Sequence, residues 1–61
     1  MTKQLEFLAT ELGTDAMAQA QQFLRNRYPA GYKKRQLEIA LKAIKRQREG
    51  REVGALERAF S

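Results

Sequence analysis

Apolar residues recur at helical spacing in the first part of the chain. Four of them follow the i, i+3, i+4, i+7 pattern that places side chains on one face of an α-helix: Leu5, Leu8, Ala9 and Leu12. Gly13 comes next, and glycine often ends a helix because it adopts left-handed backbone angles without strain. The pattern predicts an amphipathic helix over residues 3–12.

A second apolar stripe lies between Gly13 and Pro29. Its members recur every three or four residues, with two more on the flank: Met17, Ala20, Leu24 and Tyr28, with Ala16 and Phe23. Thr14 is the predicted N-cap, and Asp15 in the first turn complements the helix dipole. Because proline forces the residue before it out of the α region, the helix is predicted over residues 15–28.

The third segment predicts a helix more clearly than the fourth. The third, predicted as a helix over residues 32–49 and ended by Gly50, carries a regular core stripe: Leu37, Ala40, Leu41 and Ile44. A weak fourth helix is predicted over residues 52–60, where Val53, Leu56 and Phe60 form an apolar side. Gly54 weakens this fourth helix, because glycine is a poor helix former.

These segments predict an all-α fold, a small three- or four-helix bundle in which residues 1–61 form a single domain. With 61 residues, the chain buries only about 60% of its unfolded surface, so its stability margin is thin. Proteins of this size often gain stability from disulfides, a metal or another chain, and this sequence has no Cys and no His. We therefore expect the bundle to be stabilised as a homo-oligomer, such as a dimer, or by a partner.

Positive charge is concentrated in the middle of the chain. The net charge of the whole sequence is +5, yet residues 25–51 hold ten basic residues against Glu38 and Glu49, a local net charge of +8. Such a segment attracts phosphate-bearing polymers or an acidic protein surface. The charge alone does not choose between these two partners.

Three of the basic residues lie where helix physics does not favour them. Lys33, Lys34 and Arg35 fall in the first turn of the predicted third helix, where the helix dipole disfavours cations by about 0.3–1 kcal/mol. An anion bound there would remove this penalty. Five further candidates are weaker, since a charged helix face is common: Arg25, Arg27, Lys42, Lys45 and Arg46.

The leading hypothesis is a small basic nucleic-acid-binding protein that contacts phosphates through the third helix and the Pro29–Gly31 corner before it. A helix-turn-helix is only partly supported, because the alignment on Ala9 and Gly13 places Gln19 where a buried aliphatic residue belongs. Tyr28 and Tyr32 are interpreted as core residues rather than as base-stacking residues.

The alternative is an adaptor or inhibitor, of the kind that phages and plasmids encode, which docks on a larger protein. Its candidate partner or dimer interface consists of apolar residues beside the main stripes: Phe7, Ile39 and Phe60, with Ala43 nearby. A role at a membrane surface ranks third, because the apolar face of the third helix holds no Trp or Phe.

Catalysis is not expected. Without His and Cys, the commonest general base, the thiol nucleophile and the usual transition-metal ligands are missing. Glu38 and Glu49 lie four residues from a lysine, the spacing of helix-surface ion pairs. We expect no enzyme activity, no cofactor, no metal and no small-molecule substrate.

The polar start of the chain and the absence of a long apolar run predict a soluble, cytoplasmic protein with no membrane partner.

Overall fold

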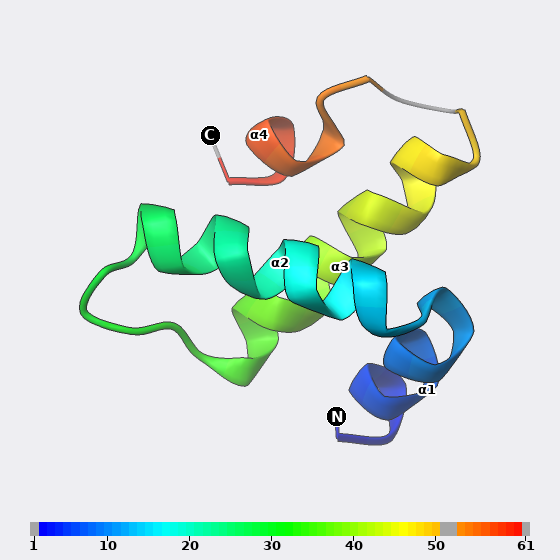
Figure 1. The fold of residues 1–61 in the computed structure, drawn as a ribbon, viewed down its shortest axis with the longest axis horizontal. Helices are drawn as coiled ribbons and strands as arrows, with labels where there is room; N and C mark the ends of the chain where they lie inside the picture. Colours follow the sequence, from blue (N-terminus) through cyan, green and yellow to red (C-terminus); the bar gives the residue numbers. More distant parts are fainter. Residues whose placement is uncertain (1, 51–52, 61) are drawn as a thin grey trace.

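The computed structural model describes residues 2–50 and 53–60. Over these residues the chain forms helices and no strand, which confirms the all-α prediction (Figure 1). The helices are α1 (Thr2–Leu12), α2 (Thr14–Arg27), α3 (Lys34–Arg48) and α4 (Ala55–Ala59). Each begins or ends within about three residues of its predicted boundary, as is usual for boundaries read from a pattern.

A single glycine joins α1 to α2. The N–H of Gly13 donates to the carbonyl oxygen of Ala9 at 2.9 Å, and the φ and ψ angles of Gly13 are 89° and 175°. These angles are accessible almost only to glycine, and they reverse the chain so sharply that α2 begins at the next residue. Thr14 is therefore inside the helix and Gly13 is its N-cap, so the prediction of Thr14 as N-cap is wrong. Asp15 does lie in the first turn, as predicted.

The corner between α2 and α3 is built around Pro29. Tyr28, the C-cap of α2, has left the helical region, with φ −125° and ψ 76°, as expected for a residue that precedes proline. The N–H of Gly31 then donates to the Tyr28 carbonyl oxygen at 2.9 Å and closes a turn. Lys33 is still extended, with φ −97° and ψ 161°, so α3 begins two residues later than the predicted residue 32.

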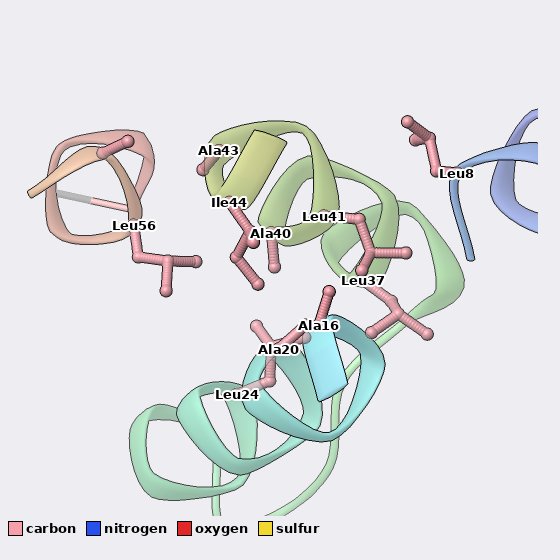
Figure 2. Close-up of a cluster of buried hydrophobic side chains, with 11 residues drawn as sticks. Leu8, Ala16, Ala20, Leu24, Leu37, Ala40, Leu41, Ala43, Ile44 and Leu56 are labelled. Atoms are coloured by element: carbon pink, nitrogen blue, oxygen red, sulfur yellow. The ribbon is translucent and has the colours of Figure 1, made fainter. Parts of the chain in front are cut away.

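The core lies along the contact between α2 and α3. All four residues of the stripe predicted for residues 32–49 are buried, and they face the small residues Ala16 and Ala20 of α2. Leu8 of α1 and Leu56 of α4 lie at opposite ends of this row (Figure 2). The alanines leave room for the larger side chains of the core, of which Leu24, Leu41 and Ile44 are fully buried.

The C-terminal segment packs differently from the prediction. Val53 is 92% exposed, because Gly54 adopts left-handed angles (φ 70°, ψ 32°) and acts as the N-cap of α4; the placement of Val53 on the apolar side of a helix is therefore wrong. Phe60 packs on the ring of Phe23, with centroids 5.6 Å apart, and on the ring of Tyr28 at 6.2 Å. Ala43 is 3% exposed and belongs to the core.

Candidate nucleic-acid interface

One face of α3 carries three basic residues, with Glu38 beside them and Glu49 just after the end of the helix. At about 100° per residue, Arg35, Lys42 and Arg46 fall on one line, opposite the buried side of the helix, and all three are exposed. We call these three residues the basic row. Ile39 lies beside them and is 36% exposed. The row exists because the core residues of α3 occupy the other side of the helix and leave this side to solvent.

Two of the candidate lysines already have acidic neighbours. Lys42 Nζ lies 3.3 Å from Glu38 Oε1, which confirms the ion pair expected from the i, i+4 spacing. Lys45 Nζ lies 3.2 Å from Glu11 Oε1 and joins α3 to α1. The i, i+4 pair within α3 contributes about 0.2–0.5 kcal/mol, and the exposed pair between α3 and α1 contributes about 0–1 kcal/mol.

The start of α3 has a different environment, and Lys33 is the N-cap of the helix, so the prediction that Lys33 lies in its first turn is wrong. Lys33, Lys34 and Arg35 are exposed, and no carboxylate of residues 2–50 or 53–60 forms an ion pair with them. Gln36 accepts the Lys33 N–H on Oε1 at 2.8 Å, while the N–H groups of Gln36 and Leu37 bind the Lys33 carbonyl oxygen. The N–H groups of Lys34 and Arg35, the first two helical residues, have no partner within the helix. Three cationic residues thus lie at a helix end that is itself electropositive.

The two arginines at the end of α2 have unequal surroundings. Arg27 Nη2 donates to the carbonyl oxygen of Phe60, just after α4, so this arginine has a structural role. Arg25 is exposed and forms no ion pair with the described carboxylates. Both arginines interact favourably with the dipole of α2, because cations stabilise a helix C-terminus.

Arg48 has a contact that the sequence pattern does not predict. Its Nη1 donates to the carbonyl oxygen of Leu12 at 2.9 Å, across 36 residues of sequence. From the sequence alone, the only role expected for Arg48 is a favourable interaction with the dipole of its own helix. A partner on another helix gives no signal in a periodic pattern, so only the fold reveals this role.

The residues predicted to form a partner or dimer interface differ in how exposed they are. Phe7 is 63% exposed on the side of α1 that faces away from the core, and Ile39 borders the basic row. Phe60 is partly buried among aromatic rings, which leaves it less available to a partner. Tyr28 and Tyr32 pack against the core cluster, in agreement with their interpretation as core residues.

Other kinds of site find little support in the described part of the chain. No group of three or more Asp and Glu side chains there is arranged to hold a metal ion. None of the described helices has the length and apolar character needed to cross a membrane. No family model matches this chain, and no similar protein was found among curated sequences or solved structures.

Proposed function

We propose that this protein binds nucleic acid through phosphate contacts from the basic row and from the start of α3. The observation that carries the proposal is the environment of Lys33, Lys34 and Arg35, three exposed cations without a carboxylate partner among the described residues. They lie at a helix end that repels positive charge. A phosphate bound there would interact favourably with all three side chains and with the helix dipole.

The rest of α3 extends the same surface. Arg46 continues the basic row without an ion pair to a described carboxylate. Lys42 and Lys45 contribute positive charge, although each lies beside a glutamate. Because an ion pair on a helix surface is weak, a polyanion can compete with Glu38 for Lys42, whereas Lys45 remains paired with Glu11 of α1. The surface then offers about five phosphate contacts, enough for strongly salt-dependent binding.

The test is a salt-dependent titration. Fluorescence anisotropy of a labelled DNA duplex is followed at salt concentrations between about 50 and 200 mM. If about five phosphates are neutralised, the plot of log K against log salt has a slope of about −4 to −5. The double variant Lys34→Glu/Arg35→Glu is expected to weaken binding and to flatten the slope by about two units.

A matched control carries the same change in net charge elsewhere. Lys3→Glu/Arg58→Glu reverses two exposed cations on α1 and α4, outside the proposed surface. Its slope is expected to stay close to that of the original protein, because phosphate contacts, and not net charge, set the slope. Equal losses in both double variants, or an unchanged affinity in Lys34→Glu/Arg35→Glu, would show that the surface is wrongly assigned.

The exposure of Phe7 favours a second candidate function, docking on an acidic protein or on a second copy of the chain. A phenylalanine that is 63% exposed in a protein of this size leaves apolar area that an interface would cover. Sedimentation equilibrium tests the homodimer. A dimer that dissociates in Phe7→Ser and persists in Val53→Ser, which also alters an exposed apolar residue, would support this function.

A further inference from the structure

The proposed function leaves open which nucleic acid is bound and how. Resting on that function, we infer that the ligand is a duplex. The protein binds it along the phosphate backbone and does not recognise the base sequence. Three features of the structure support this inference: the use of the amide side chains of α3, the position of α3 between its neighbours, and the packing of the aromatic residues.

The amide residues of α3 do not lie on the basic row. Asn and Gln side chains read adenine through paired hydrogen bonds, and α3 carries two, Gln36 and Gln47. Gln36 Oε1 is occupied by the Lys33 N–H at 2.8 Å. Gln47 lies about 120° around the helix from the middle of the row. Neither amide is placed to read a base that faces Arg35, Lys42 and Arg46.

The neighbours of α3 also oppose deep entry into a groove. On one side of the basic row Lys45 reaches Glu11 of α1. On the other side the buried Ala43 points toward α4 (Figure 2). A lone helix with its side chains, about 10–12 Å across, already fills a major groove about 12 Å wide. With helices on both flanks, α3 is held at the level of the phosphates, so Arg35 and Arg46 contact the backbone and not the base edges.

The aromatic residues favour a duplex over a single strand. Proteins that bind single strands stack bases on exposed aromatic rings. Of the five aromatic residues in the sequence, four pack on the core or on one another: Phe23, Tyr28, Tyr32 and Phe60. The fifth, Phe7, is exposed on α1 and not on the basic row. A surface that binds by charge alone prefers the duplex, which has a charge every 1.7 Å or so against about 3.4 Å for one strand.

The experiment compares ligands of equal length at one salt concentration. The set contains several duplexes with permuted sequences, a duplex of A·T pairs, a duplex of G·C pairs and one unpaired strand. We expect the duplex dissociation constants to agree within about threefold and the single strand to bind at least about tenfold more weakly. A duplex bound more than about tenfold tighter than its permutations, or a single strand bound as tightly as the duplexes, would overturn the inference.

Two variants sharpen the result. Gln47→Ala removes an exposed amide, and Gln36→Glu keeps an acceptor for the Lys33 N–H while removing the amide donors. Both are expected to leave the ratios among the duplexes unchanged, with Gln36→Glu weakening all of them alike through its negative charge. A loss confined to one sequence would indicate base reading and overturn the inference. Absence of binding to every polymer would instead refute the proposed function itself, so the two failures are distinguishable.

Discussion

Arg48 of α3 donates a hydrogen bond from Nη1 to the carbonyl oxygen of Leu12, the last residue of α1. The carbonyl end of a helix is electronegative, so a cation there satisfies an otherwise free acceptor and complements the dipole. Arg27 does the same for the carbonyl oxygen of Phe60, which caps α4. Two arginines of the basic segment thus contact helix ends, so only the remaining cations are available to the proposed ligand.

This contact predicts different effects for two arginines on the same helix. Arg48→Met removes the bond to Leu12 and is expected to lower the free energy of unfolding by about 1–2 kcal/mol. Arg46→Met removes no described ion pair and should change it by less than about 0.5 kcal/mol, while weakening duplex binding more than Arg48→Met does. Urea unfolding and anisotropy titration measure the two properties. The assignment fails if the two variants lose stability equally.

A second matched pair compares two phenylalanines. Phe60→Ala removes a ring that packs on Phe23 and Tyr28 and holds α4 against the bundle, so we expect a loss of about 2–4 kcal/mol. Phe7→Ala alters a ring that is 63% exposed and should cost less than about 0.5 kcal/mol. Thermal unfolding followed by circular dichroism measures both. If Phe7→Ala were as destabilising as Phe60→Ala, Phe7 would have to be buried in solution, as in a dimer.

Most of the helices could be predicted because their signals are local. The stripe from Leu37 to Ile44 repeats at helical spacing, and both Pro29 and Gly50 act on their own neighbourhood. Two of the errors arose where a glycine changed the starting point of a helix. Gly13 and Gly54 became N-caps, which moved Thr14 into α2 and placed Val53 outside α4. A periodic pattern shows that a glycine interrupts a helix, but not on which side of it the next helix begins.

The candidate site could be predicted only in part, for a related reason. The pairing of Lys42 with Glu38 follows from spacing within one helix. The pairing of Lys45 with Glu11 and the bond from Arg48 to Leu12 join helices that are far apart in sequence. Such contacts depend on how the helices cross, and the spacing of residues within one helix does not reveal this. The sequence therefore indicated a charged surface without separating its structural cations from those available to a ligand.

The two glycines that cap helices should respond differently to asparagine. Gly13 has angles of 89° and 175°, a region that is strained for every other residue, so Gly13→Asn is expected to cost about 1–3 kcal/mol. Gly54 has left-handed helical angles of 70° and 32°, which asparagine tolerates, so Gly54→Asn should cost less than about 1 kcal/mol. Both variants are compared by chemical unfolding. Equal destabilisation would indicate that the two turns do not differ as described.

The pairing of Lys45 with Glu11 predicts a gain in binding from the loss of a carboxylate. Glu11 Oε1 lies 3.2 Å from Lys45 Nζ, so Glu11→Gln frees the lysine for a phosphate and removes a negative charge beside the basic surface. We expect tighter duplex binding and a salt slope steeper by about one unit, with a loss of stability below about 1 kcal/mol.

Glu6→Gln is the matched control, because it removes the same charge from an exposed position of α1 that forms no ion pair with a described residue. It should change affinity slightly through net charge and leave the slope unaltered, since it frees no cation. A slope that steepens equally in both variants would show that Lys45 gains no phosphate contact. A slope that steepens in Glu11→Gln alone would place Lys45, and with it the α1 side of α3, within reach of the duplex.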